Sequence, residues 1–254
     1  MPTDQELIKI VPSSRQLAYQ ATEFYAFFHF GMNTYTGSEW GNGKENPNQF
    51  QLTNDFDEET YVKAIHDAGF KKLIITAKHH DGFCLFDTKL TDYNSMNAAC
   101  HKDLVKEFLE AFRAEGIKVG LYFSIIDWRH PDFPHYGDMH HPMRNHPECS
   151  NENRDFDRYL DFMFGQIKEL LTNYGKLDLM WFDFSYGDMK CDKWKAQELI
   201  SMVRSIQPWL IIDNRLEGSA EDSGSILTAN PTEYSGDFAS PEQMIPPAGI
   251  RNEL

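Results

Sequence analysis

Protonatable or hydrogen-bonding side chains lie at or just beyond the ends of five separate apolar runs in this sequence. In chain order they are His29, the triplet His79-His80-Asp81, Tyr122 with Asp127, Asp183, and Arg215. Any one of them could be an ordinary hydrogen-bonded structural residue. If the five runs are neighbouring parallel strands, however, their carboxyl ends meet at one edge, where barrel enzymes place their active sites. The recurrence therefore favours one shared site over five unrelated structural residues.

Asp183 is the strongest candidate for a catalytic group. It follows four apolar residues, Leu179 to Phe182, so its carboxylate would be shielded on one side by Trp181 and open to a substrate on the other. A glycosidase nucleophile requires such an environment. The spacing alone fits a helix N-cap equally well, and both interpretations stay open at this point.

The adjacent histidines His79 and His80 suggest a second chemistry. Neighbouring side chains of a strand point to opposite faces, so only one would face a shared metal ion unless the strand has already ended. With His29 and Asp183 they could supply the ligands of a metal-dependent barrel hydrolase, which is the main rival hypothesis. A pair of hydrogen-bonded core histidines is a third interpretation. Four more histidines of the segment 130–150 are expected to be exposed loop residues: His135, His140, His141 and His146.

The apolar runs have the pattern of strands in a parallel sheet. Each is short, rich in β-branched or aromatic residues and nearly continuous, as in strands that are buried on both faces. The predicted strands are Tyr25–Phe30, Lys72–Ala77, Lys118–Ser124, Leu177–Phe182 and Leu210–Asp213, with a weak sixth near Glu233–Ser235.

Amphipathic helices are predicted between these strands. They run from Asp57 to Gly69, Asp103–Glu115, Asn153–Tyr174 and Lys193–Ile206. This alternation predicts repeated βα units, hence a (β/α)8 barrel or a doubly wound sheet. No GxGxxG follows any strand, which weakens a dinucleotide-binding version of the fold.

Length and charge limit the classes of function. The 254 residues suit one large domain, and 39 acidic against 24 basic residues give a net charge of −15. Such a charge repels nucleic acids and anionic membranes, so we expect neither as a partner. No apolar stretch approaches the roughly 20 residues of a membrane span.

Cysteine usage and the first residues bear on the cellular compartment. The four cysteines, at positions 84, 100, 149 and 191, stand far apart without a CxxC pair, which indicates neither a zinc ribbon nor a disulfide framework. The first residues, MPTDQELIKIVPSSRQ, have no basic start followed by an apolar run, so they do not resemble a signal peptide. We expect a cytoplasmic protein, while a secreted or lysosomal location stays open if a leader has been removed.

Five segments resemble the motif series of the family 29 glycoside hydrolases, the α-L-fucosidases. They are FHFGMNTYTGSEW (28–40), TAKHHDGFCLF (76–86), GLYFSIIDWRH (120–130), MWFDF (180–184) and GDFASPEQMIP (236–246). The segments occur in the family's order. HHDGF is specific in combination with the EW and WFD segments and would be weak by itself.

The resemblance implies a (β/α)8-type (TIM-like) catalytic barrel over residues 1–254, with no metal or organic cofactor. It implies a retaining, exo-acting glycoside hydrolase that releases terminal α-L-fucose from a fucosylated oligosaccharide or glycoconjugate. The family's nucleophile corresponds to Asp183, on which a covalent fucosyl-aspartate would form. The family's fucose-binding residues correspond to His29, Glu39, Trp40, His79, His80, Tyr122, Trp181 and Arg215.

The acid/base residue occupies different positions in different branches of the family. Glu242 in SPEQ is the first choice, because GDF-x-x-PEQ resembles the acid/base segment of one branch. Glu217 and Glu233 are the alternatives. The chemistry requires a carboxylic acid with a raised pKa, in a drier setting than the nucleophile.

Relatives in this family usually continue through further barrel strands and a C-terminal β-sandwich. This sequence ends at Leu254, so we expect a barrel that stops before its last strands and lacks the sandwich. Such a barrel would leave an open apolar edge at Tyr25–Phe30, which favours association and low activity. A non-catalytic relative that binds fucose without turnover is therefore a third functional hypothesis. Linkage preference and oligomeric state are not indicated by the sequence.

Overall fold

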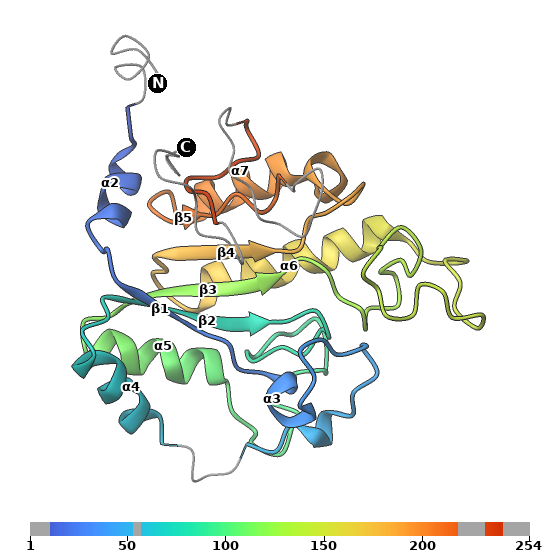
Figure 1. Cartoon of the computed structure of the whole chain (residues 1–254), viewed down its shortest axis with the longest axis horizontal. Coiled ribbons are helices and arrows are strands. Elements are labelled where there is room, and N and C mark those ends of the chain that lie inside the picture. Colours follow the sequence, from blue (N-terminus) through green and yellow to red (C-terminus); the bar gives the residue numbers. More distant parts are fainter. Residues whose placement is uncertain (1–10, 53–56, 218–231, 241–254) are drawn as a thin grey trace.

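The computed structural model describes residues 11–52, 57–217 and 232–240 and contains a five-stranded parallel sheet (Figure 1). The strands lie in the order β1-β2-β3-β4-β5, so each strand pairs with the next one along the chain. Their bounds are Tyr25–Phe28, Lys72–Lys78, Lys118–Ser124, Leu179–Asp183 and Ile211–Ile212. All four pairings are parallel, and parallel neighbours require a crossover connection.

Four amphipathic helices lie on these crossovers: α4 Glu58–Asp67, α5 Leu104–Ala114, α6 Phe156–Asn173 and α7 Ala196–Ile206. The first three are capped by Asp57, Asp103 and Asp155, whose side chains accept hydrogen bonds from first-turn amides. The fourth helix begins three residues later than predicted. The preceding residues Cys191–Trp194 form the short 3-10 helix η2, and Lys195 then takes a left-handed conformation with φ 48°.

Two apolar clusters lie on the two faces of the sheet. On the face covered by helices, Ile75 and Phe123 of the strands pack in one core with Phe108 and Ile167 of the helices. On the opposite, inner face, a smaller cluster contains Ile74, Tyr122, Leu179, Ile211 and Phe238. Every residue of β2 is buried, which explains why its sequence is a continuous apolar run rather than an alternating one.

The predicted strands match the structure with differences at their ends. The strand Lys118–Ser124 is confirmed at both ends, whereas β1 stops at Phe28 and leaves His29 beyond the strand. The strand β4 extends to include Asp183, and β5 is reduced to two residues. Since these shifts are small, the predicted side chains still reach one edge of the sheet.

The weak sixth strand predicted near Glu233–Ser235 is wrong. These residues form a turn in which the Ser235 amide donates to the Thr232 carbonyl. The Ser235 hydroxyl also donates to Glu217 at 2.7 Å, so side-chain bonding competes with extension of the backbone. The segment meets the sheet further on, where Phe238 forms a single parallel bridge with Asp213.

Two short helices were not predicted, α2 (Ser14–Gln20) and α3 (Met32–Thr36), because both are too brief to show a clear apolar stripe. Helix α2 meets the segment 237–238, which is far from it in the sequence. Arg15 Nε lies 2.6 Å from Asp237 Oδ1, and the Tyr19 ring stacks on Phe238 with centroids 4.7 Å apart. The two segments therefore cover part of the inner cluster beside β5.

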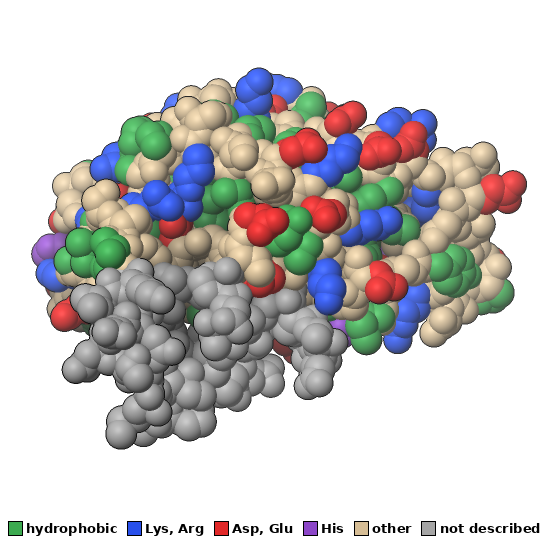
Figure 2. Space-filling view, turned by 90° about the horizontal axis from the view of Figure 1, so that it is seen from above, with side chains coloured by type: hydrophobic (Ala, Val, Ile, Leu, Met, Phe, Trp, Pro, Cys, Tyr) green, Lys and Arg blue, Asp and Glu red, His purple; other side chains and the backbone are tan. Residues whose placement is uncertain are grey.

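Among the described residues the sheet is open, with β1 and β5 at its edges. Closure into an eight-stranded barrel, and the expected interruption of that barrel, stay predictions. Basic and acidic side chains are interspersed over the described part of the face in Figure 2, a pattern typical of a solvated surface. No helix in the described ranges combines the length and the apolar composition that crossing a bilayer requires.

Candidate active site

Asp183 is the last residue of β4, and its side chain is 12% exposed. Both of its carboxylate oxygens accept hydrogen bonds. The Tyr122 hydroxyl donates to Oδ2 at 2.5 Å, and Arg215 Nη1 donates to Oδ1 at 2.7 Å. The next two described helices have Lys190 and Lys195 at their N-cap positions, so the N-cap interpretation of Asp183 is wrong. A carboxylate with a fixed orientation and a small exposed surface is suited to attack a bound substrate.

Arg215 is positioned by Ser240, a residue that was not predicted for this role. Its Nε donates to the Ser240 hydroxyl at 3.0 Å, and its Nη2 donates to the Ser240 carbonyl at 3.2 Å. Asn214 fixes the same serine by accepting a hydrogen bond from its amide at 3.1 Å. The guanidinium carbon also lies 5.4 Å from the centre of the Trp181 ring. Planar, multiply bonded arginine side chains of this kind orient carboxylates rigidly.

His79 and His80 lie beyond the end of β2, and both are buried. The His79 ring lies 4.5 Å from the His29 ring and 5.9 Å from the Tyr122 ring, measured between centroids. His80 Nδ1 is 2.7 Å from the Ser124 hydroxyl. Burial, together with the neighbouring histidines, holds the pKa of both imidazoles well below its ordinary value. Both are therefore neutral hydrogen-bonding groups near neutral pH.

Trp40 forms an aromatic wall with three rings that come from separate segments. Its ring centroid lies 6.0 Å from Trp128, 5.6 Å from His140 and 5.5 Å from Phe184. The Trp40 side chain remains 43% exposed, so it can contact a ligand. The preceding residue, Glu39, is also exposed. The wall therefore presents an apolar surface next to polar groups, as sites for amphipathic ligands do.

Phe184 directly follows Asp183 and has a φ of 83°. Bulky residues rarely adopt this left-handed region, which costs on the order of 1 kcal/mol or more and persists only where surrounding contacts impose it. The Phe184 ring contacts His80 and Tyr186, with centroids 4.3 Å and 4.9 Å away. The chain thus turns sharply immediately after the carboxylate, and strain of this kind concentrates at functional sites.

Asp138 connects the long segment 130–150 to the aromatic wall. Its Oδ2 accepts a hydrogen bond from Trp128 Nε1 at 2.8 Å, and its Oδ1 accepts from the amides of His140 and His141. The Tyr186 hydroxyl donates to the same carboxyl group. Burial raises the pKa of Asp138 to about 6. This residue was not predicted, because its partners lie in different parts of the sequence.

The prediction that the histidines of this segment are exposed is wrong for two of them. His135 and His141 are buried, whereas His140 is half-buried and His146 is exposed. Arg154 Nη2 lies 3.1 Å from His135 Nε2, and Arg154 also donates to nearby carbonyls. A distant arginine therefore holds a segment whose proline and histidine content suggests a solvated loop. Burial lowers the pKa of His141 to about 3.

The proposed acid/base Glu242 lies outside the described residues. Of its alternatives, Glu217 is half-buried and accepts hydrogen bonds from Thr232 and Ser235 at 3.0 Å and 2.7 Å. Glu233 is exposed. The Glu217 carboxylate thus anchors the turn at 232–235, which is a structural use of the group.

The metal-dependent hypothesis gains no support from the described part of the chain. There, no group of three or more His, Cys, Asp or Glu side chains is placed to share a metal ion. The rings of His29 and His79 do lie together. The oxygens of Asp183, however, face Tyr122 and Arg215.

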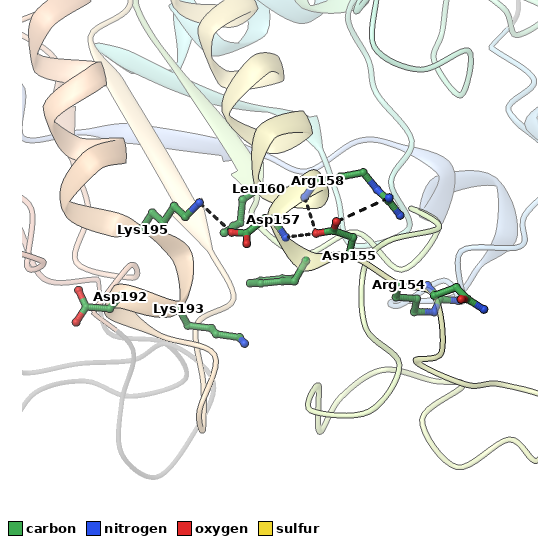
Figure 3. Close-up of a pocket in the computed structure, with 10 residues that line it drawn as sticks. Arg154, Asp155, Asp157, Arg158, Leu160, Asp192, Lys193 and Lys195 are labelled. Carbon is green, nitrogen blue, oxygen red and sulfur yellow. Dashed lines mark hydrogen bonds and ion pairs between the residues drawn. The ribbon is translucent and has the colours of Figure 1, made fainter.

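A cavity of about 820 Å³ lies at the beginning of α6 (Figure 3). Its lining is strongly charged, but the charges pair with one another or with near neighbours. Lys195 Nζ lies 2.9 Å from Asp157, and Arg158 Nη2 lies 2.7 Å from Asp132. None of its ten lining residues belongs to the predicted site. The cavity is therefore separate from the group around Asp183.

Comparison with known proteins identifies the family. A family model described as α-L-fucosidase matches residues 14–252. The chain belongs to the α-L-fucosidase family. Among solved structures of fucosidases, isoenzyme 1 from Paenibacillus thiaminolyticus is 47% identical with a TM-score of 0.85, over 95% of this chain and 59% of that one.

Two further fucosidases extend the comparison. A family 29 enzyme from Bacteroides thetaiotaomicron, trapped as a covalent intermediate with 2-fluoro-fucosyl fluoride, is 28% identical with a TM-score of 0.67, over 82% of this chain and 50% of that one. Alpha-L-fucosidase 1 of Arabidopsis thaliana is 34% identical over 206 residues, which are 80% of this chain and 37% of the plant fucosidase. The chain thus spans between about a third and three fifths of the length of these relatives.

Proposed function

We propose that the protein is a retaining, exo-acting α-L-fucosidase that releases terminal fucose from oligosaccharides or glycoconjugates. The observation that carries the proposal is the carboxylate of Asp183, held at the end of β4 by Tyr122 and Arg215 in a chain of this family. A related fucosidase has been trapped as a covalent intermediate, which supports covalent chemistry here. The five parallel strands would be part of a (β/α)8-type barrel, with the site at their carboxyl ends.

In the first chemical step Asp183 would act as the nucleophile. An oxygen of its carboxylate would attack the anomeric carbon of fucose. A glycosyl ester bond would form while the bond between the anomeric carbon and the leaving oxygen breaks. Tyr122 and Arg215 keep the carboxylate in one orientation, so little motion is needed to reach the substrate. As the carboxylate becomes an ester it loses its negative charge, and these two donors also govern how readily it leaves in the second step.

The second carboxyl group would be Glu242. It would give its proton to the departing oxygen in the first step and remove a proton from the attacking water in the second. This exchange leaves the anomeric configuration unchanged. Glu217 is the weaker alternative, because its two hydrogen bonds already anchor the turn at 232–235.

The sugar would be recognised by the remaining predicted residues. Neutral imidazoles at His29, His79 and His80 would hydrogen-bond hydroxyl groups, and burial of the last two supports that state. Trp40 and Trp181 would pack against the apolar face and the methyl group of fucose. Glu39 would accept a hydrogen bond from a further hydroxyl.

Replacing the nucleophile tests the proposal. Asp183→Ala should abolish turnover of an aryl α-L-fucoside, and azide should restore part of the rate by giving a fucosyl azide of inverted configuration. Asp188→Ala, which removes an exposed carboxylate nearby, should leave turnover unchanged. Near-normal turnover in Asp183→Ala would disprove the assignment. Fucose binding without turnover by the unaltered protein would indicate a non-catalytic relative, and loss of activity with a chelator would favour the metal-dependent alternative.

A further inference from the structure

The strand β2 contains a bulge just before the histidines of the site. Pairing with β3 passes from Thr76 to Lys78 on β2 while it advances by a single residue on β3, so Ala77 is an extra residue. The Ala77 carbonyl accepts a hydrogen bond from the Leu85 amide at 2.8 Å instead. Because side chains alternate along a strand, one added residue reverses the face toward which all later side chains point.

This reversal is seen in the contacts on either side of the bulge. Ala77 packs in the helix-covered core, so plain alternation would turn Lys78 to the inner face and His79 toward the helices. Instead the Lys78 ammonium lies on the helix side, 4.5 Å from the centre of the Phe123 ring. The His79 ring lies beside Tyr122 on the inner face. Because of the bulge, the side chain of His79, and not that of Lys78, points into the site.

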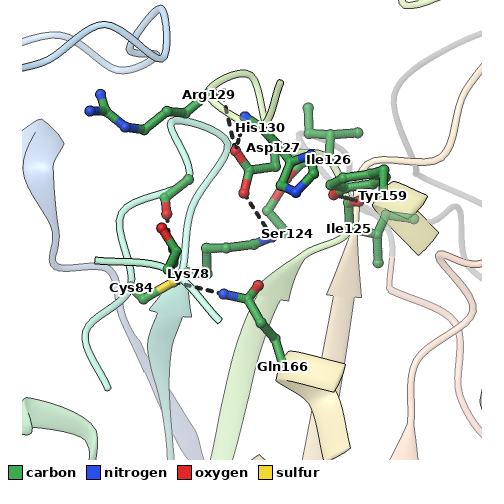
Figure 4. Close-up of polar contacts among 12 residues, drawn as sticks. Lys78, Cys84, Ser124, Ile125, Ile126, Asp127, Arg129, His130, Tyr159 and Gln166 are labelled. Carbon is green, nitrogen blue, oxygen red and sulfur yellow. Dashed lines mark hydrogen bonds and ion pairs between the residues drawn. The ribbon is translucent and has the colours of Figure 1, made fainter. Parts of the chain in front are cut away.

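Lys78 is fully buried, and its ammonium lies 3.4 Å from Oδ2 of Asp127, which is also buried (Figure 4). The partner comes from the turn after β3. The Asp127 Oδ1 accepts hydrogen bonds from the amides of Arg129 and His130 at 3.0 Å and 2.9 Å. A buried ammonium without an opposite charge would be strongly unfavourable, so the lysine is held on the helix side by this carboxylate.

The same carboxylate also contacts the far end of the histidine turn. A Cβ atom on Gly82 would lie 2.3 Å from Asp127 Oδ1, and Gly82 has a φ of 83°. The glycine is therefore required both by its backbone angle and by the closeness of the carboxylate. Between Lys78 and Gly82, the His80 carbonyl accepts a hydrogen bond from the Trp128 amide at 2.9 Å. Asp127 thus contacts both ends of the turn that carries the two histidines, and Trp128 bonds to its middle.

We propose that Lys78 and Asp127 are positioning residues, whose buried ion pair fixes the bulge at Ala77 and thereby directs His79 into the site. The proposal deepens the proposed function, because it gives the reason why a fucose-binding histidine reaches its place. Neither residue need touch the substrate. Their effect on it passes through the orientation of the histidine turn, where displacements of about 1 Å can cost on the order of 100-fold in rate.

A double-mutant cycle separates positioning from general stability. Lys78→Met removes the charge at similar volume, and we expect it to weaken binding of a fucose-configured iminocyclitol by about 10- to 100-fold. In a His79→Ala background the same change should weaken binding clearly less, because the part of its effect that passes through His79 is already lost. Gln207→Met is the matched control, since this buried side chain also makes several hydrogen bonds, near the amino end of β4. Its effect should be the same in both backgrounds.

Further variants keep the test valid if Lys78→Met does not fold. The pair Lys78→Met with Asp127→Asn leaves no unpaired charge, and the asparagine can still accept the two backbone hydrogen bonds. We expect this pair to fold and to lose the ligand affinity that Lys78→Arg, which retains the ion pair, keeps in part. Equal affinity in the neutral pair and the unaltered protein would overturn the proposal, as would a full effect of Lys78→Met in the absence of His79.

A spectroscopic measurement makes the outcome independent of fucosidase activity. The ring nitrogens of His79 can be followed by NMR in protein labelled with ¹⁵N-histidine and assigned through His79→Ala. We expect their signals to shift in the Lys78 variants and to stay in place in Gln207→Met. Unchanged signals in the Lys78 variants would contradict the proposal even if the protein proved inactive on every fucoside. Shifted signals in an inactive protein would support the positioning role and refute the proposed function alone.

Discussion

The Tyr122 hydroxyl and the Asp183 carboxylate are joined by a hydrogen bond of 2.5 Å that links β3 to β4 on the inner face of the sheet. The two residues are separated by 61 positions in the sequence, but Tyr122 pairs with Trp181 in the sheet register. Tyr122 therefore lies two residues before Asp183 in the register, and its phenol points along the strands toward the carboxylate. Since Arg215 holds the other oxygen, the carboxylate is fixed from two directions, by a residue of β3 and by a residue of the turn that follows β5.

Tyr122→Phe tests the value of this hydrogen bond. A hydrogen bond to a charged group contributes about 1.5–3 kcal/mol, so we expect kcat/KM for an aryl fucoside to fall by about 10- to 150-fold. The ring itself would keep its contacts with Phe27 and His79, and stability should change little. Tyr174→Phe, which removes a hydroxyl bonded to Asp103 on the helix-covered side, should affect stability but not kcat/KM. Equal activity losses in both variants would show that the phenol has no special role.

Replacing the glutamates distinguishes the acid/base candidates. Glu242→Gln should slow cleavage of natural glycosides much more than cleavage of dinitrophenyl fucoside, whose leaving group needs no proton. Glu217→Gln retains an acceptor for the turn at 232–235 and should slow neither substrate selectively. The ratio of the two rates in each variant is the measurement. A selective effect in Glu217→Gln or Glu233→Gln would move the assignment to that residue.

Removing the exposed ring of the aromatic wall should weaken substrate binding rather than folding. For Trp40→Ala we expect KM to rise by about tenfold, since a large aromatic contact is lost. Because 43% of the side chain is exposed, the free energy of unfolding should change by less than about 1 kcal/mol. Trp209→Ala is a suitable control, because this tryptophan is 45% exposed and bonds to Leu177, just before β4 begins. A comparable rise of KM in the control would contradict the role of Trp40.

Stability should fall on acidification from pH 7 to pH 5. His79, His80 and His141 have lowered pKa values in the native state, whereas unfolded histidines titrate near pH 6.5. Below about pH 6.5 these histidines therefore bind protons in the unfolded state that they do not bind in the native state, and this difference favours unfolding. The raised pKa values of Asp81 and Asp138, about 7 and 6, act in the opposite direction, as does the raised pKa of the buried Asp213. Burial also lowers the pKa values of His29, His130 and His135, so the histidines outnumber these carboxyl groups.

Urea unfolding at pH 5, 6 and 7 measures this balance. We expect the midpoint to be highest near pH 7. His141→Asn should flatten the dependence, because it removes one of the histidines that take up a proton on unfolding. Asp138→Asn should steepen it, because it removes an opposing group. A midpoint that rises toward pH 5 would show that the buried carboxyl groups outweigh the histidines and would contradict the prediction.

The sequence indicated the side chains that lie together around Asp183 better than it indicated the residues that support them. Asp183 was recognisable because a carboxylate directly after a buried strand is unusual, and the strand-end histidines were recognisable for the same reason. The support of Arg215 by Ser240 and of Trp128 by Asp138 was not recognisable. Hydroxyl and carboxyl groups in loops have no periodicity, and their partners become neighbours only when the chain has folded.

The orientation of the two histidine side chains also could not be predicted from the sequence. Alternation along a strand suggested opposite faces for His79 and His80, but the strand ends at Lys78 and a bulge precedes it. Nothing in the letters TAKHHDG marks Ala77 as the extra residue. The bulge follows from a pairing with β3 and from the charge on Asp127, both distant in the sequence. Local patterns thus indicated the candidate residues, whereas the directions of their side chains depended on contacts between elements.

The contact between α2 and Asp237 has a consequence for the order in which the molecule folds. Arg15 and Asp237 lie 222 positions apart, and every strand pairing is parallel, so many native contacts join segments that are distant in the sequence. Chains of this kind fold slowly, since distant segments must meet before their contacts stabilise anything. During synthesis Tyr19 emerges early, but its contact with Phe238 can form only when almost all of the described chain has been made. The inner face of the sheet is therefore the last part to be covered, and in that interval it is the surface most open to incorrect pairing with other chains.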